Sequence, residues 1–137
     1  DTRASRVLCI PLRDEADESC AKMLAQLLAL DGLAVDVASA DSLSGEVVEQ
    51  VAAIGADVVV ISILPPIAQR ETRLLWKRLR ARYPDLPIIV GYWLGPNATE
   101  SLLPPPGDAA SKVATTLAEA VTLIRSAAAQ RKLAKAV

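Results

Sequence analysis

The stretch DVVVISIL, residues 57–64, decides the fold of this 137-residue chain. After its first residue it is almost wholly apolar and rich in Val and Ile, which is typical of a strand buried on both faces. A segment this apolar is a poor edge strand. It therefore predicts a central strand in a parallel sheet that helices cover on both sides.

Four other segments have the composition of strands. They are residues 6–12 (RVLCIPL), 34–39 (AVDVAS), 87–94 (PIIVGYWL) and 112–114 (KVA). Because helix-like segments separate them, the strands should pair in parallel through right-handed crossovers. Five such strands favour the flavodoxin-like order 2-1-3-4-5. The predicted fold is α/β, a three-layer α/β/α sandwich around a five-stranded parallel sheet.

Helices are expected between and after these strands. They cover residues 15–30, residues 44–55, a segment of about eighteen residues opened by Pro65 and Pro66, a short segment around 97–103, and the segment from Thr116 onward. The last begins with a capping-box pattern, Thr116 to Glu119. The length suits one domain, 1–137, with a core at about 6–128. The charged tail, 129–137, is expected to fray.

The composition excludes several classes of function. Lys and Arg total 15 and Asp and Glu total 16, so no overall positive charge favours nucleic acid. The chain has no histidine. It therefore cannot form a Ser-His-Asp triad, a Cys-His pair or a His-ligated zinc site. We expect no catalytic residue and no enzyme activity. Cys9 and Cys20 form no C-x-x-C pair and are interpreted as two buried thiols.

Four acidic residues follow the first strand, in the stretch PLRDEADESC, residues 11–20. Asp14 can cap the helix that begins there, and Asp17 and Glu18 then lie in its first turn, where the helix dipole favours negative charge. The other interpretation is a Mg²⁺ or Ca²⁺ site, and hence a metal-dependent enzyme that uses Asp14, Glu15, Asp17 and Glu18. Receiver domains also carry acids here, but they add an Asp at the end of strand three, where this chain has only SILPP.

The predicted topology places a crevice between strands one and three. Ligands of open α/β sheets bind outside the carboxyl ends of the strands at such a switch point. The acidic cluster and Ser62-Ile63-Leu64 should face this crevice together. The turn after strand one has no glycine, so a dinucleotide fingerprint or a P-loop is excluded. We expect no cofactor and no metal.

The third helix is strongly basic. It carries Arg70, Arg73, Lys77, Arg78, Arg80 and Arg82 against Glu71. These side chains form either a solvated outer face or a surface for anionic lipid or an acidic partner. Each Lys or Arg near an anionic membrane contributes about 1 kcal/mol. Trp76 among them could be an interfacial anchor.

The order of the elements resembles the cobalamin-binding domain family. Its signature is D-x-H-x-x-G after strand one, S-x-L after strand three and G-G after strand four. Glu15, Asp17 and Cys20 stand at the D, H and G positions, Ser62-Ile63-Leu64 retains S-x-L, and Gly91-Tyr92 stands at G-G. The resemblance implies this fold without the cobalt ligand, and with the ring of Tyr92 in the slot for the nucleotide tail. The crevice candidates are Asp14, Asp17, Ser62, Leu64, Gly91 and Tyr92.

A second resemblance rests on three blocks. RVLCIPLRDEADESCAKMLAQLL, ADVVVISILPP and LWKRLRARYPDLPIIVGYW look like the soluble C-terminal domain of autoinducer-2 exporter-like (putative permease) bacterial membrane proteins, over roughly residues 6–125. It implies a regulatory or interaction domain on the cytoplasmic side of the bacterial inner membrane. Its partners would be the membrane-spanning part of the same protein, an anionic lipid surface or a second copy. The start at Asp1 suits a piece of a longer protein.

These observations leave three functions open. The first is a non-catalytic domain of a membrane transporter with a cobalamin-type crevice that has lost its cofactor. The second is a functional cobalamin sensor or carrier module. The third is the metal-dependent enzyme built on the acidic cluster.

Overall fold

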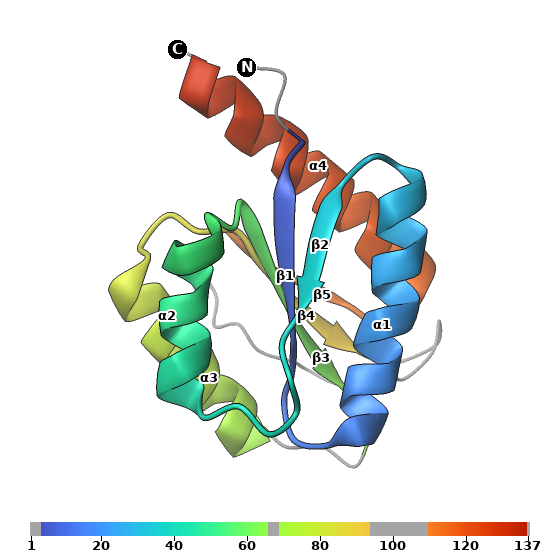
Figure 1. The fold of residues 1–137 in the computed structure, drawn as a ribbon, viewed down its shortest axis with the longest axis vertical. Coiled ribbons are helices and arrows are strands. Elements are labelled where there is room, and N and C mark those ends of the chain that lie inside the picture. The colour runs from blue at the N-terminus through green and yellow to red at the C-terminus, as the bar shows by residue number, and fades with distance from the viewer. Residues whose placement is uncertain (1–3, 66–68, 94–109, 137) are drawn as a thin grey trace.

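The computed structural model describes residues 4–65, 69–93 and 110–136. Strands and helices alternate through most of these ranges (Figure 1). The elements are β1 (Arg6–Pro11), α1 (Glu15–Leu30), β2 (Ala34–Val37), α2 (Ser44–Ile54), β3 (Val58–Ile63), α3 (Gln69–Arg82), β4 (Ile88–Tyr92), β5 (Ser111–Ala114) and α4 (Leu117–Ala136). The expected short helix at 97–103 lies outside the described residues, as do Pro66 and Leu94.

The strands form one parallel sheet in the order β2-β1-β3-β4-β5. This order confirms the predicted flavodoxin-like topology. Strand β3 lies at the centre, with Val60 paired to Cys9 of β1 and to Ile89 of β4. Every residue of β3 is buried, as its composition predicted.

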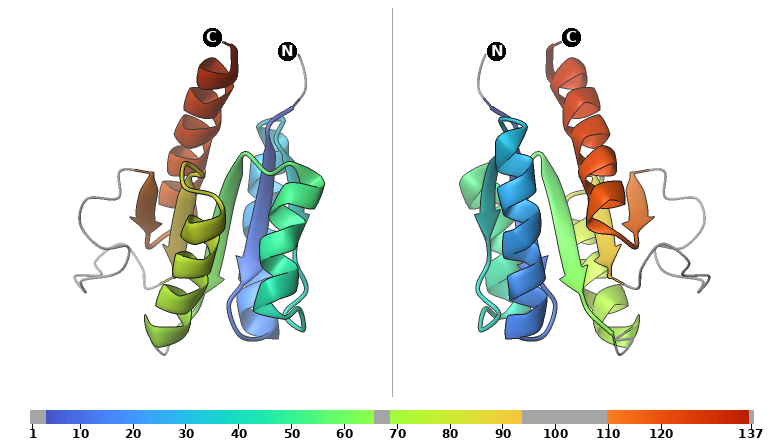
Figure 2. Two further views of the ribbon diagram at one scale, coloured as in Figure 1. Left: turned by 90° about the vertical axis from the view of Figure 1, so that its left-hand side faces the viewer. Right: turned by 90° about the vertical axis from the view of Figure 1, so that its right-hand side faces the viewer.

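Helices cover both faces of the sheet (Figure 2). Helices α2 and α3 pack on one face, and α1 and α4 on the other. Because side chains alternate along a strand, β3 contributes Val59, Ile61 and Ile63 to the first core and Val58 and Val60 to the second. Each fully buried Val or Ile stabilises the fold by roughly 2 kcal/mol. This double burial is why the central strand is apolar throughout.

The ends of α1 and α2 follow the expected local chemistry. Asp14 caps α1, and its Oδ1 accepts hydrogen bonds from the amides of Ala16 and Asp17, both at 3.1 Å. Gly55 ends α2 with φ of 68°, a left-handed conformation that glycine adopts without a steric penalty. The caps therefore fix where these helices begin and end.

The C-terminal tail differs from the prediction. Helix α4 continues to Ala136 instead of fraying after residue 128. Lys135 Nζ lies 2.6 Å from Asp57 Oδ1, and Asp57 Oδ2 accepts a hydrogen bond of 2.8 Å from the Arg6 amide. The Asp57 side chain is only 7% exposed, so this ion pair fastens the helix end to the amino edge of the sheet. None of the described helices is both long and apolar enough to cross a bilayer.

Candidate functional site

The acidic residues after β1 point to different partners. Asp14 caps α1, as described above, whereas Glu18 reaches the loop after β2. Glu18 Oε1 accepts a hydrogen bond of 2.7 Å from the Ala40 amide, and its Oε2 lies 3.0 Å from Lys22 Nζ. The Ala40 hydrogen bond, and then Lys22, lower the pKa of Glu18. The cluster that appears continuous in the sequence is therefore divided in space.

Asp17 is the buried member of the cluster. Its side chain is fully buried, and it ties the turn after β1 to the end of β3. Oδ2 accepts a hydrogen bond of 3.0 Å from the Arg13 amide, and Oδ1 accepts one of 2.8 Å from the Leu64 amide. The prediction of a first-turn acid held by the helix dipole is thus incomplete, because this carboxylate links two segments far apart in the sequence.

Two further hydrogen bonds close the same edge. Arg13 Nη2 donates to the carbonyl oxygen of Leu64 at 2.6 Å, and Ser62 Oγ donates to that of Asp17 at 2.8 Å. Arg13 Nε also lies 3.7 Å from Asp17 Oδ2. We call these four residues, Arg13, Asp17, Ser62 and Leu64, the rim cluster. Sequence reasoning missed Arg13, since its partner is a backbone carbonyl and no motif marks it.

The acids do not form a set of metal ligands. Within the residues that the structure describes, no three His, Cys, Asp or Glu side chains are close enough to hold a metal ion. Mg²⁺ and Ca²⁺ require several converging oxygens. Both oxygens of Asp17 already accept backbone hydrogen bonds. The geometry therefore gives no support to the metal-dependent alternative.

Trp93 covers Gly91, where the resemblance to cobalamin-binding domains implied that the ring of Tyr92 would fill the slot. Ser62 of β3 pairs with Gly91 of β4, and Trp93 Nε1 donates a hydrogen bond of 2.8 Å to Ser62 Oγ. A Cβ atom on Gly91 would lie 2.4 Å from two carbons of the Trp93 ring, closer than side chains tolerate. The indole therefore lies directly against Gly91 and occupies the space above it.

The expectation that Tyr92 fills this slot is wrong. Tyr92 is 2% exposed and packs in the core beneath α2 and α3, on the opposite face of the sheet from Trp93. The reason is the alternation of side chains along a strand, which places residues 91 and 93 on one face and residue 92 on the other. That alternation is the signal in the sequence that could have identified Trp93, which the prediction overlooked.

Neither cysteine carries an activated thiol. Cys9 is buried in β1, and burial raises the pKa of its thiol to about 12. The prediction of two buried thiols is wrong for Cys20, which is partly exposed on α1. Desolvation, and then the negative charge of Asp17, raise the pKa of its thiol as well. Both thiols are protonated at neutral pH, so neither is an activated nucleophile.

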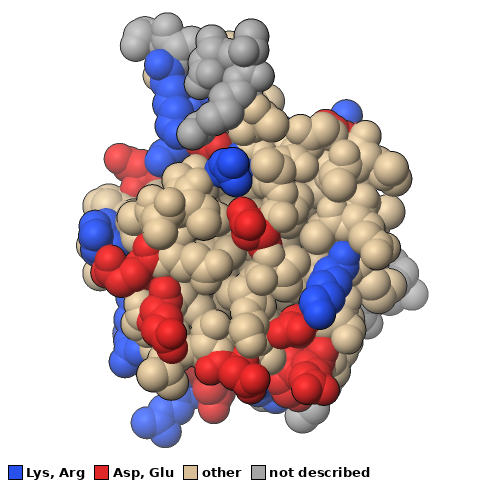
Figure 3. All heavy atoms as spheres, viewed as in Figure 1, with Lys and Arg blue, Asp and Glu red and all other residues tan. Residues whose placement is uncertain are grey.

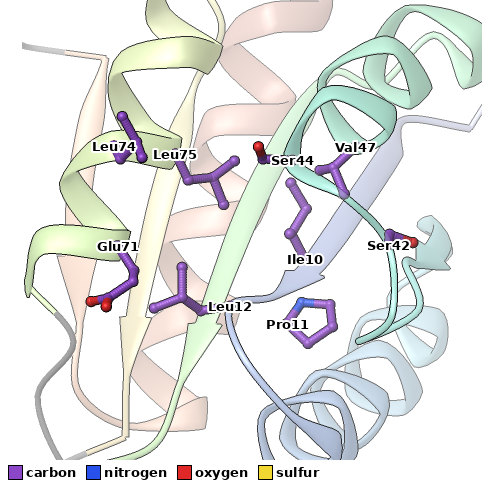
Figure 4. A pocket seen from close by; sticks show the side chains of 9 residues that line it. All are labelled: Ile10, Pro11, Leu12, Ser42, Ser44, Val47, Glu71, Leu74 and Leu75. Atoms are coloured by element: carbon purple, nitrogen blue, oxygen red, sulfur yellow. The ribbon is translucent and has the colours of Figure 1, made fainter.

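A cavity lies on the other face of the sheet, between α2 and α3 (Figure 4). Its volume is about 200 Å³, and its walls are largely apolar. It is lined by Ile10, Pro11, Leu12, Ser42, Ser44, Val47, Glu71, Leu74 and Leu75. In contrast to the covered slot beside Ser62, this hollow is open at the carboxyl edge of the sheet.

The basic residues of α3 have unequal roles. Arg80 was expected on an outer surface, but it donates to the carbonyl oxygens of Tyr83, Pro84 and Leu86 and to Ser111 Oγ. Its guanidinium also lies 6.0 Å from the centre of the Trp76 ring, so Arg80 is a structural residue. Trp76 itself is 9% exposed and donates to Ser111, which removes it as an interfacial anchor.

The remaining basic residues lie on the exposed side of the helix. Arg78 donates to Ser44 Oγ, and Arg82 Nε lies 3.9 Å from Glu49 Oε1. Arg70, Arg73 and Lys77 are exposed, and within the described part of the chain no carboxylate pairs with them. These three are the cations of α3 that remain available to an external ligand.

Comparison with known proteins identifies the fold. The chain matches no family model and no curated protein. A cobalamin-binding protein from Desulfitobacterium hafniense DCB-2 is similar in structure, with a TM-score of 0.68 and 14% identity over 91% of this chain. A response regulator receiver domain protein from Clostridium thermocellum is similar with a TM-score of 0.59 and 18% sequence identity. That match covers 94% of this chain and 98% of the receiver protein.

A receiver protein from Sinorhizobium medicae WSM419 gives a TM-score of 0.56 and 16% identity, covering 96% of this chain and 99% of that one. The present chain spans 60% of the length of the cobalamin-binding protein. At these identities the similarity establishes a flavodoxin-like fold that resembles cobalamin-binding and receiver domains.

Replacement of Asp17 tests the rim cluster. Asp17→Ala leaves the partly buried amides of Arg13 and Leu64 without their acceptor, so we expect a loss of about 2 kcal/mol in the free energy of unfolding. Urea denaturation followed by circular dichroism measures it. Glu15→Ala is the matched control, because Glu15 is exposed, and it should change stability by about 0.5 kcal/mol or less. Equal effects of the two substitutions would contradict the proposed role of Asp17.

A double-mutant cycle tests whether Trp93 occupies the space above Gly91. Gly91→Ala should destabilise the native chain by about 2 kcal/mol, because the new methyl group displaces the indole. In a Trp93→Ala background the same change should cost almost nothing, since the space is then empty. Equal costs in both backgrounds, measured by urea denaturation, would show that the ring lies elsewhere.

Proposed function

We propose that this chain is a non-catalytic regulatory or interaction domain whose cobalamin-type crevice is closed by its own side chains. The observation that supports this most directly is Trp93, which lies against Gly91 and donates its indole hydrogen to Ser62. In the resembling family, small residues at these positions leave a slot for a nucleotide tail. Here an aromatic ring of the protein fills that space.

The remaining residues of the edge also fail to fit cobalamin. The chain has no histidine to ligate cobalt, and Asp17, at the corresponding position, uses both carboxylate oxygens to accept backbone amides. Freeing that carboxylate would leave two partly buried amide donors without their acceptor, at about 1 kcal/mol or more each. The site therefore favours a domain without the cofactor over a cobalamin sensor or carrier.

The closed edge has a mechanical consequence. Asp17 and Arg13 join the turn after β1 to the residue that follows β3, so these two segments cannot separate without breaking several hydrogen bonds. We therefore expect this edge of the domain to behave as a rigid unit. Its contacts with partners would then come from its outer helices rather than from the crevice.

The proposed partner is the membrane-spanning part of a bacterial transporter. The support is the sequence resemblance to autoinducer-2 exporter-like proteins, carried by the blocks that include β1 with α1, β3, and α3 with β4. In this role the domain lies on the cytoplasmic side of the inner membrane. It biases the transport cycle, or assembles the transporter, by docking against the membrane part or against a second copy.

Hydroxocobalamin distinguishes the closed crevice from a functional cofactor site. The purified chain, mixed with an excess of hydroxocobalamin and passed through a desalting column, is expected to emerge without a corrinoid absorption band. Trp93→Ala should give the same result, because removing the indole supplies no cobalt ligand. A stoichiometric chromophore that stays bound to the native chain would refute the cofactor-free proposal.

Membrane extraction tests the transporter proposal. The full gene product, expressed with an affinity tag, is expected to stay in the membrane pellet after alkaline carbonate, because spans of about 20 apolar residues resist such extraction. Residues 1–137 expressed alone serve as the control and should appear in the supernatant. Release of the full gene product by carbonate would exclude an integral membrane partner in the same polypeptide.

A further inference from the structure

Charge is unevenly distributed over the molecule. Helix α3 contains six of the 15 basic residues and one of the 16 acidic residues, although the net charge of the whole chain is −1. The rest of the chain therefore carries nine basic and fifteen acidic residues. Figure 3 shows basic side chains at the lower left edge, where α3 lies, and acidic side chains across much of the lower part of the same face.

The outward side of α3 combines these cations with one exposed leucine. Arg70, Leu74, Lys77 and Ala81 follow one another at spacings of four, three and four residues, which places them on one stripe of the helix. All four are exposed, and so is the neighbouring Arg73. Leu74 is 51% exposed, in the middle of the basic stripe.

Leu74 also borders the apolar cavity between α2 and α3. Figure 4 shows it near the cavity rim together with Leu75 and Glu71. Leu43, at the start of α2, is 71% exposed and is adjacent in sequence to two of the residues that line the cavity, Ser42 and Ser44. The basic stripe thus adjoins apolar surface that the fold leaves open to solvent.

We propose that this face of α3 docks on an anionic phospholipid bilayer. Arg70, Arg73 and Lys77 contact the phosphate headgroups, and Leu74 inserts among the upper acyl segments. At an anionic membrane surface, cations attract the headgroups, and an apolar side chain among them enters the interface. The inference goes beyond the proposed function, because it concerns lipid contact by this chain itself and requires no membrane-spanning partner.

The same face could be read as a site for an acidic protein segment. Charge alone suits either ligand, but the exposed leucine and the adjoining apolar rim favour a lipid surface, which presents negative charge with hydrocarbon directly beneath it. An experiment can separate the two ligands, since only binding to a bilayer should require Leu74.

Liposome flotation provides the test. The chain should float with vesicles of equimolar phosphatidylglycerol and phosphatidylcholine and should not float with pure phosphatidylcholine. Each basic residue near an anionic surface strengthens binding about fivefold, so the triple variant Arg70→Gln, Arg73→Gln, Lys77→Gln should bind about 100-fold more weakly. Leu74→Ser should weaken binding several-fold, and 1 M salt, where the screening length is about 3 Å, should abolish most of it.

A matched control removes the same charge elsewhere. The triple variant Lys22→Gln, Lys112→Gln, Arg125→Gln changes exposed cations of α1, β5 and α4 and should float as the native chain does. Circular dichroism verifies that each variant is folded. Equal loss of flotation in both triple variants would overturn the assignment to α3. If Leu74→Ser binds vesicles as the native chain does, and poly-glutamate displaces both chains equally well, the proposed lipid contact would be overturned in favour of an acidic protein partner.

Discussion

The burial of β3 on both faces is the constraint from which the rest of the structure follows. A strand with no exposed side needs a neighbour strand on each edge and a helix layer above and below. Strands β1 and β4 are the two neighbours, both paired in parallel with β3, and the crossover helices form the two layers. In this topology the chain adds β2 on one side of β1 and β3 on the other. The carboxyl ends of the parallel strands β1 and β3 therefore lie together at one crevice.

In open α/β sheets this crevice is where ligands bind, and in this chain side chains of the protein occupy it. The amide of Leu64, beyond the end of β3, has no strand partner, and the buried carboxylate of Asp17 accepts its hydrogen. Ser62 would be a polar group facing a slot, but it donates to the Asp17 carbonyl and accepts from the Trp93 indole. Among the described residues, the Asp17 carboxylate, the Leu64 amide and the Ser62 hydroxyl therefore find their partners within the protein, whereas Arg13 Nε is buried without a hydrogen bond, 3.7 Å from Asp17 Oδ2.

The sequence predicted the fold well because the fold depends on patterns. Apolar periodicity, the cap at Asp14 and the stop at Gly55 are local signals, and the structure confirms the sheet order derived from them. The site was predicted less well because it depends on partners distant in the sequence. Asp17 lies beside Ser62 and Leu64, yet nothing local indicated that its carboxylate would bond to Leu64. Strand alternation did indicate that Trp93 rather than Tyr92 would lie over Gly91, but the prediction overlooked it.

The two faces of the sheet consequently differ in what remains free to act. Beneath α1 and α4, the ring of Trp93 lies against Gly91 and the carboxylate of Asp17 accepts backbone hydrogen bonds, so side chains of the protein occupy that edge. Beneath α2 and α3, an apolar cavity stays open, and α3 beside it carries Arg70, Arg73 and Lys77, which have no acidic partner among the described residues. The proposed interaction through the outer surface of α3 therefore uses the side of the sheet on which the fold leaves cations and apolar surface exposed.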